Sequence, residues 1–197
     1  MTFKKITVFG SASTAISKKY NDQAFKLGQL IAKNNSTLVY GVGDTGMMGQ
    51  VFHGLLKECG AVRGITTQKL MELQCDDPSL FKKGEMEIVP DLSTRKFMMF
   101  DEGDVMVILP GGWGTVDELA EFCVLIQTGR IKKKPMIFVN LGGFWSPMKK
   151  QIKVMYREGC LNDNKTNFIG FVRKVERVIP EATKIAKKLE KLEKLTK

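Results

Sequence analysis

The chain has 197 residues, 43% of them hydrophobic, which suits a single domain with a substantial apolar core. Its formal net charge is +10, so the positive field favours an anionic ligand or partner. The first residues enter an apolar run too short for a signal peptide or a membrane span, and the four cysteines include no C-x-x-C pair. We therefore expect a soluble cytoplasmic protein with reduced thiols, with no disulfide framework, metal site or membrane contact.

Short apolar runs alternate with helical patterns along the chain. The predicted strands are, in order, residues 6–10, 37–41, 61–66, 87–90, 105–109 and 135–140. The predicted helices are residues 21–35, a segment marked by Met48, Val51, Phe52 and Leu55, and residues 93–101, 115–128 and 144–158. Continuous apolar runs are typical of strands buried on both faces. The pattern predicts one α/β domain, a doubly wound parallel sheet between two layers of helices, with ligands at the carboxyl ends of the strands.

The C-terminal segment 183–197 contains six Lys and two Glu. Ile185, Leu189 and Leu192 form the apolar stripe of an amphipathic helix, which either docks on the domain of residues 1–182 or extends as a tail. A basic surface of this kind can bind a phosphate backbone. However, its lysines are not interleaved with aromatic residues, and only six of the 31 basic residues of the chain are Arg. The sequence therefore disfavours nucleic-acid binding.

Three predicted strand-to-helix turns, at 9–14, 40–49 and 110–115, are rich in glycine or small residues. The second contains Gly41, Gly43 and Gly46 in the G-x-G-x-x-G spacing of a dinucleotide site. The acidic residue that such sites need about 20 positions later is missing, which argues against NAD binding. We expect these glycines to let the backbone approach a ligand or the neighbouring loop closely.

The third turn has the features of a phosphate site. Gly111, Gly112 and Gly114 permit positive φ angles and leave backbone N–H groups uncovered. Thr115 is the expected N-cap of the following helix, whose free amides and dipole favour an anion. No Lys-Ser/Thr pair follows, so the turn is not a Walker P-loop, and no magnesium-binding set is expected.

Two charged positions near these turns have alternative explanations. The spacing of Thr115 and Glu118 fits a capping box, but Glu118 is also a carboxylate at the ligand end of the sheet. Arg95 and Lys96 begin a predicted helix, where positive charge opposes the dipole unless an anion or carboxylate compensates it. They are either a solvated basic pair or part of the same site.

The motifs together match a known pattern. The stretch PGGWGTVDE (110–118) resembles the P-G-G-x-G-T-x-x-E signature of the LONELY GUY (LOG) family, the cytokinin riboside 5′-monophosphate phosphoribohydrolases. VFGSAS (8–13), YGVGDTGMMG (40–49) and TRK (94–96) are similar to further blocks of that family, in the same order. Similar sequences are often labelled lysine decarboxylases, but no pyridoxal-phosphate site is recognisable here. The resemblance implies a Rossmann-like fold and a homodimer with sites near the interface.

The resemblance also implies a reaction, which needs no cofactor or metal. It is hydrolysis of the N-glycosidic bond of AMP or an N6-modified AMP, which releases a base and ribose 5-phosphate. By position, Arg95 and Glu118 become the catalytic pair. The implied nucleotide-binding residues are Lys96, Gly10, Ser11, Gly43, Gly46, Gly111, Gly112, Trp113, Gly114 and Thr115. Breaking this bond builds positive charge on the ribose, which a carboxylate can stabilise, and a nearby cation is expected to keep Glu118 ionised.

The chain departs from the family pattern at three positions, Ser93, Val124 and Gln74, which bear on the choice of base. The alternative function is that of a nucleotide-binding or carrier protein on the same scaffold, which retains the phosphate site without hydrolysis. The presence of both Arg95 and Glu118 favours the enzyme, because a carrier has no need of this carboxylate.

Overall fold

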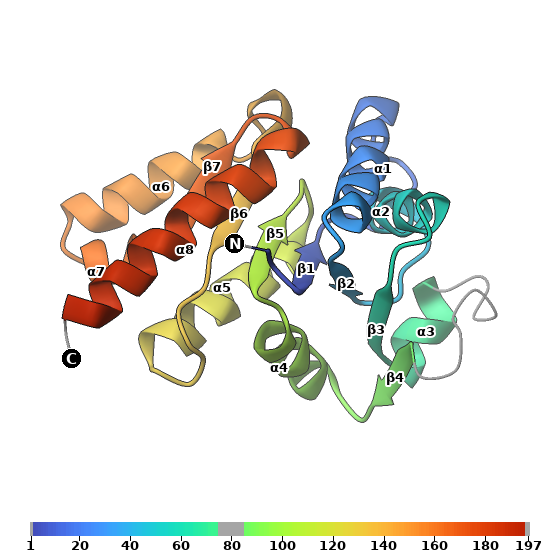
Figure 1. The fold of residues 1–197 in the computed structure, drawn as a ribbon, viewed down its shortest axis with the longest axis horizontal. Helices are drawn as coiled ribbons and strands as arrows, with labels where there is room; N and C mark the ends of the chain where they lie inside the picture. Colours follow the sequence, from blue (N-terminus) through green and yellow to red (C-terminus); the bar gives the residue numbers. More distant parts are fainter. Residues whose placement is uncertain (1, 75–84, 196–197) are drawn as a thin grey trace.

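The computed structural model describes residues 2–74 and 85–195, whose arrangement is shown in Figure 1. Within this part of the chain, seven strands form one sheet in the order β4-β3-β2-β1-β5-β6-β7. The strands are β1 (Lys5–Phe9), β2 (Thr37–Tyr40), β3 (Val62–Thr67), β4 (Met86–Val89), β5 (Val105–Ile108), β6 (Met136–Val139) and β7 (Ile169–Val172). All neighbouring pairs are parallel, so the carboxyl ends of the strands share one edge of the sheet.

Helices cover both faces of this sheet. They are α1 (Lys18–Lys33), α2 (Gly46–Lys57), α3 (Gln68–Gln74), α4 (Leu92–Glu102), α5 (Trp113–Gln127), α6 (Ser146–Arg157), α7 (Asp163–Thr166) and α8 (Val178–Leu195). Figure 1 shows α1 and α2 on one side of the central strands and α4 on the other. After β4 the chain crosses the sheet and continues at β5, on the far side of β1. The prediction of a doubly wound three-layer α/β domain is confirmed.

The core lies between the central strands and these helices. All four residues of β5 and of β6 are buried, which explains their continuous apolar sequences. The helices α1 and α2 touch through their backbones: a Cβ atom on Gly28 would lie 2.0 Å from the carbonyl oxygen of Val51. A Cβ on Gly54 would lie equally close, 2.0 Å, to the carbonyl oxygen of Phe25. Any larger residue at either glycine would push the two helices apart.

The C-terminal part of the chain differs from the prediction in its boundaries. Strand β7 was not predicted, although three of its four residues are apolar and only Gly170 interrupts the run. A Cβ on Gly170 would lie 2.8 Å from Cδ1 of Ile185, so the glycine lets α8 approach the strand. Helix α8 begins at Val178 rather than at residue 183, and it packs on β6 and β7. Its Ile185 and Leu189 are buried, whereas Leu192 is 39% exposed.

Two further expectations concern cysteines and membranes. Cys59, Cys123 and Cys160 are free thiols, and Cys75 lies outside the described residues. Among the described helices, none combines the length and apolar character that crossing a bilayer requires.

Candidate active site

A cavity of about 390 Å³ opens at the carboxyl ends of β1, β2 and β5. This is the point where the chain changes direction across the sheet, which is where doubly wound proteins bind their ligands. The turn after β1, the turn after β2, the first turns of α4 and the N-terminus of α5 form its walls. The volume lies in the range of small-molecule sites.

The glycine-rich turn after β5 forms one wall, but not in the way the sequence suggested. Helix α5 begins at Trp113 with Gly112 as its N-cap, at φ −93°, so Thr115 is not the N-cap and Thr115–Glu118 is not a capping box. Gly111, Gly112 and Gly114 do not use the positive φ angles that glycine permits, since none of them lies in the left-handed region. Sequence reasoning placed the start of the helix too late. A glycine N-cap supplies no side-chain acceptor, so it leaves little signal in the sequence.

These glycines serve to make room. A Cβ on Gly111 would lie 2.2 Å from Oγ1 of Thr115, whereas a Cβ on Gly112 or Gly114 would meet nothing within 4 Å. The space in front of Gly112 and Gly114 belongs to the cavity. The first amides of α5 have no acceptor within the helix, and they carry the positive end of its dipole. This wall can therefore bind an anion such as a phosphate.

Arg95 of α4 and Glu118 of α5 meet in the wall of the same cavity. Nη1 of Arg95 lies 3.6 Å from Oε1 of Glu118, and their side chains are only 11% and 13% exposed. Nε of Arg95 donates a hydrogen bond of 3.1 Å to the carbonyl oxygen of Ile65, at β3. Gly41 is required for this placement, because a Cβ there would lie 1.6 Å from Nη2 of Arg95. The guanidinium thus occupies space that only a glycine leaves free.

The electrostatics of Glu118 correct one expectation. Burial raises its pKa to about 7, although the charge of Arg95 acts in the opposite direction and that of Asp117 adds to the rise. The sequence argument considered the cation and left out the larger cost of desolvation. Burial also lowers the pKa of Arg95, which nevertheless stays charged at neutral pH. A carboxyl group that titrates near pH 7 can accept and return a proton under neutral conditions.

Lys96 lines the same cavity, and its charge is compensated by α5. Its Nζ lies 2.8 Å from Oδ2 of Asp117 and also forms an ion pair with Glu121. Burial acts to lower the pKa of Lys96, but the hydrogen bonds to the two carboxylates outweigh it and raise the pKa. Carboxylates of α5 therefore compensate the positive charges at the start of α4. These contacts also hold the two helices side by side.

The turn after β2 carries backbone strain next to the cavity. Val42 has φ 67°, an unusual value for a β-branched residue, and it is buried. Gly46, at φ 58°, packs against the turn after β1, since its Cβ would lie 2.6 Å from the carbonyl carbon of Ala12. Met47 N donates to Ser11 O at 2.9 Å across the same contact. Gly46 thus serves the neighbouring loop, one of the two roles that the sequence predicted.

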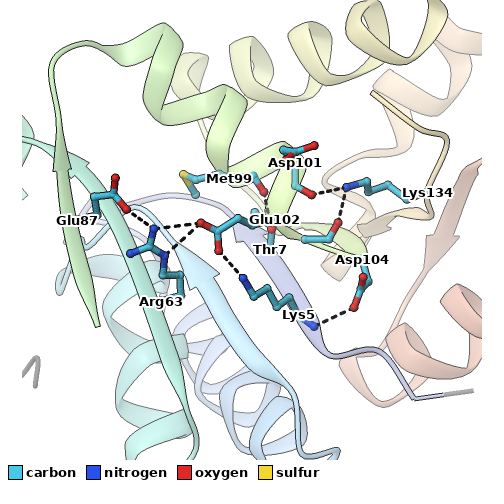
Figure 2. A network of polar contacts seen from close by, with 10 residues as sticks. Lys5, Thr7, Arg63, Glu87, Met99, Asp101, Glu102, Asp104 and Lys134 are labelled. Atoms are coloured by element: carbon cyan, nitrogen blue, oxygen red, sulfur yellow. Dashed lines mark hydrogen bonds and ion pairs between the residues drawn. The ribbon is translucent and has the colours of Figure 1, made fainter. Parts of the chain in front are cut away.

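Helix α4 is anchored at the edge of the sheet away from the cavity, as Figure 2 shows. Nζ of Lys134 donates to the carbonyl oxygens of Phe100, Asp101 and Gly103, at 2.7, 3.0 and 2.6 Å. These are C-terminal carbonyls of the helix, which would otherwise lack partners. At the other end, Asp91 caps the helix by accepting a hydrogen bond from Thr94 N at 2.8 Å.

Ion pairs also join the C-terminal end of α4 to the sheet. Glu102 accepts from Nζ of Lys5 at 2.6 Å and from Nη2 of Arg63 at 3.1 Å, and Arg63 also pairs with Glu87 (Figure 2). Burial acts to raise the pKa of Glu102, but Lys5 and Arg63 outweigh it and lower the pKa. The helix that carries Arg95 is therefore fixed at both ends.

The structure brings most of the predicted residues to one cavity. Those that line it are Arg95, Glu118, Lys96, Gly10, Ser11, Gly43, Gly112, Gly114 and Thr115. Gly46, Gly111 and Trp113 do not line it, and the Trp113 side chain is 87% exposed. Further residues line the cavity that sequence reasoning did not assign to the site: Val8, Phe9, Ala12, Met48, Leu70 and Leu92. Gly41 had a signal as part of the glycine fingerprint, whereas apolar helix residues such as Leu70 look like core.

Two of the three departures from the family pattern, Ser93 and Val124, do not line the cavity. Ser93 and Val124 lie on exposed positions of α4 and α5. The side chain of Gln74 lies outside the described residues.

Together, the fold and the cavity define a doubly wound α/β protein with an anion site and a buried Arg–carboxylate pair at the switch point of its sheet. Residues 48–182 match a family model described as possible lysine decarboxylase. A cytokinin riboside 5′-monophosphate phosphoribohydrolase of Arabidopsis thaliana is 31% identical over 193 residues, which cover 94% of this chain and 89% of the relative. A probable enzyme of the same name from Oryza sativa subsp. japonica is 30% identical, over 95% of this chain and 78% of the relative. The chain belongs to this family of enzymes, the LONELY GUY family.

Solved structures share the fold at lower identity. The molybdenum cofactor carrier protein of Chlamydomonas reinhardtii aligns with a TM-score of 0.65 and 18% identity, over 93% of this chain and 98% of that protein. The molybdenum cofactor binding protein of Rippkaea orientalis aligns with a TM-score of 0.66 and 20% identity, over 93% of this chain and 97% of that protein. At this identity the likeness concerns the fold.

Proposed function

We propose that this protein hydrolyses the N-glycosidic bond of a purine nucleoside 5′-monophosphate, AMP or an N6-modified AMP, to a free base and ribose 5-phosphate. The observation that carries the proposal is the pair Arg95–Glu118, 3.6 Å apart and buried in the wall of a cavity that also contains the N-terminus of α5. The activity named for the curated relatives supports it, and the carrier function offers no reason for the raised pKa of Glu118.

In this proposal the phosphate binds to the free amides at the start of α5, which directs the ribose toward Glu118. Cleavage of the C1′–N bond builds positive charge on the ribose, and the ionised carboxylate stabilises it. A water molecule adds its hydroxide to C1′ and gives its proton to Glu118, which can then pass a proton to the departing base. Arg95 donates hydrogen bonds to the leaving base or to the phosphate.

A direct assay tests the proposal. The purified protein is incubated with AMP, N6-isopentenyl-AMP, CMP and GMP, and both free base and ribose 5-phosphate are measured. We expect both products in equal amounts from at least one purine nucleotide and little from CMP. Binding of these nucleotides without release from any of them would reject the hydrolase and favour the carrier.

We also propose that the protein works as a homodimer whose interface includes the outer surface of α4 and α5. Leu92 and Val124 are 53% and 55% exposed, and Phe97 is 38% exposed. Val124 follows Asp117 and Glu121 at helical spacing on α5, so it lies on the face that contacts Lys96 of α4. Large exposed apolar residues beside a polar cavity are typical of a subunit interface near a site.

A further inference from the structure

A second cavity, of about 310 Å³, opens at the carboxyl ends of β6 and β7. Asn140 directly follows β6, Arg173 directly follows β7, and the first turns of α6 form the third wall. An adjoining hollow shares Asn140 and Arg173 and extends to Gly142 and Gly143. The second cavity has no lining residue in common with the candidate active site, although both lie at the same edge of the sheet.

The charge of this cavity is one-sided. Four of its lining residues are cations, Lys149, Lys150, Lys153 and Arg173, and none is acidic. In residues 2–74 and 85–195, no ion pair with a carboxylate involves any of these four side chains. Lys96 near the first cavity shows the contrast, because two carboxylates neutralise it. The second cavity holds positive charge that the carboxylates of the described residues leave uncompensated.

The placement of these lysines is costly for α6. The N-terminus of the helix presents the positive end of its dipole to the cavity. The first turn contains no acidic residue that would offset this charge. Lys149 and Lys153 are four residues apart on the same face of the helix, where like charges repel each other. A bound anion would relieve both effects at once.

The walls of the cavity are fixed by neutral contacts. Asn140 accepts a hydrogen bond from Trp145 N at 2.7 Å and donates one to Oγ of Ser146 at 3.1 Å, which holds the start of α6 against the end of β6. Phe171 stacks on Phe138 with ring centroids 4.6 Å apart. The side chains that remain free to meet a ligand are therefore the cations.

We propose that this cavity binds a small molecule with a diphosphate group or two phosphate groups, separately from the nucleotide in the candidate active site. Four cations that line one open hollow match a compact group with several negative charges. A single-stranded nucleic acid fits less well, since it needs exposed rings for base stacking. Here Phe138 stacks on Phe171, and Nζ of Lys149 lies 5.2 Å from the centroid of the Phe171 ring.

The two tryptophans of the chain allow the sites to be observed separately. Trp113 belongs to the glycine-rich turn of the first cavity, and the backbone N–H of Trp145 bonds to Asn140 in the second. Protein labelled with 5-fluorotryptophan is titrated with inorganic diphosphate and followed by fluorine NMR. We expect a saturable shift of the Trp145 resonance. A titration in which only the Trp113 resonance moves, or neither does, rejects the proposal.

Charge-matched variants test whether the binding is local. The double variant Lys150→Ala/Arg173→Ala removes two exposed cations of the cavity, and we expect diphosphate to bind at least about tenfold more weakly. Lys187→Ala/Lys188→Ala removes the same charge from the exposed face of α8 and should keep the wild-type affinity. Equal weakening in both variants would show attraction by net charge alone and overturn the proposal. So would a Trp145 shift caused by an RNA oligomer but not by diphosphate.

Discussion

At the scale of single residues, the site depends on how a buried carboxyl group and a buried guanidinium share one wall. Arg95 reaches that wall because Gly41 lacks a side chain, and Glu118 reaches it from the second turn of α5. Neither residue is free to turn to solvent. The pKa of Glu118 is therefore set by desolvation, which raises it, and by its charged partner Arg95, which lowers it.

The substitution Glu118→Gln keeps the size of the side chain and removes its ability to ionise. We expect the variant to fold and to bind AMP, because the substitution leaves unchanged the amides of α5 that we propose as the phosphate site. Its turnover should fall by about 10²-fold or more, the contribution typical of a positioned acid or base. Release of ribose 5-phosphate gives the rate and calorimetry the affinity. Glu190→Gln on the exposed face of α8 is the control. Near-normal hydrolysis by Glu118→Gln would remove Glu118 from the chemistry.

The pH profile should report the same carboxyl group. Because burial raises the pKa of Glu118 to about 7, and only its ionised form accepts a proton from water, kcat/KM should rise with pH through about 7 and then level off. In Arg95→Gln the loss of the neighbouring cation should move this limb to higher pH. The substrate phosphate, with a second pKa of about 6, titrates at the same pH in both proteins. If the rise of kcat/KM occurs at the same pH in Arg95→Gln as in the wild type, it reports the ionisation of the substrate phosphate and not that of Glu118.

The order of the motifs predicted that Arg95 and Glu118 lie together, but it did not predict the ionisation of Glu118. That property depends on how completely α4, α5 and the turn after β2 exclude water, which sequence spacing does not contain. Gly41 was visible as a glycine of the fingerprint. Its contact with the guanidinium joins residues 54 positions apart and became evident only in three dimensions.

At the scale of secondary structure, α4 extends from the cavity, which its first turns line, to the opposite edge of the sheet. Lys134 satisfies three carbonyl oxygens at its C-terminal end. In Lys134→Met these carbonyls lose a charged donor and partly lose access to water. We expect a loss of about 2–3 kcal/mol in the free energy of unfolding, measured by urea denaturation.

Lys132→Met is the matched control from the same loop. Lys132 forms an exposed ion pair with Glu193 at 3.2 Å, and exposed pairs contribute at most about 1 kcal/mol. Equal effects of the two substitutions would show that the carbonyl contacts of Lys134 add nothing beyond charge. A larger effect at Lys134 would establish it as the anchor of α4.

The elements that the sequence predicted well are those with a strong apolar pattern. The buried strands β5 and β6 are examples. The start of α5 was misplaced because Gly112 caps the helix without a side chain. Strand β7 was missed because Gly170, which lets α8 approach the strand, interrupts its short apolar run.

At the scale of the whole molecule, both proposed ligand sites lie at the same edge of the parallel sheet. The candidate active site lies at the ends of β1, β2 and β5, and the basic cavity lies at the ends of β6 and β7. The opposite edge carries the anchoring ion pairs of α4 (Figure 2). The contacts that anchor α4 and the proposed ligand sites are thus at opposite edges of the sheet.

The proposed dimer can be tested at this scale with two valines on exposed helix surfaces. Val124 on α5 is 55% exposed beside the cavity, and Val154 on α6 is 37% exposed on another part of the surface. A glutamate at position 124 would place a charge inside the proposed interface, where it would lose its hydration without gaining a partner. We expect Val124→Glu to sediment as a monomer at concentrations at which the wild type and Val154→Glu are dimers. Dimers in all three proteins would place the interface elsewhere, whereas a monomeric wild type would reject the dimer itself.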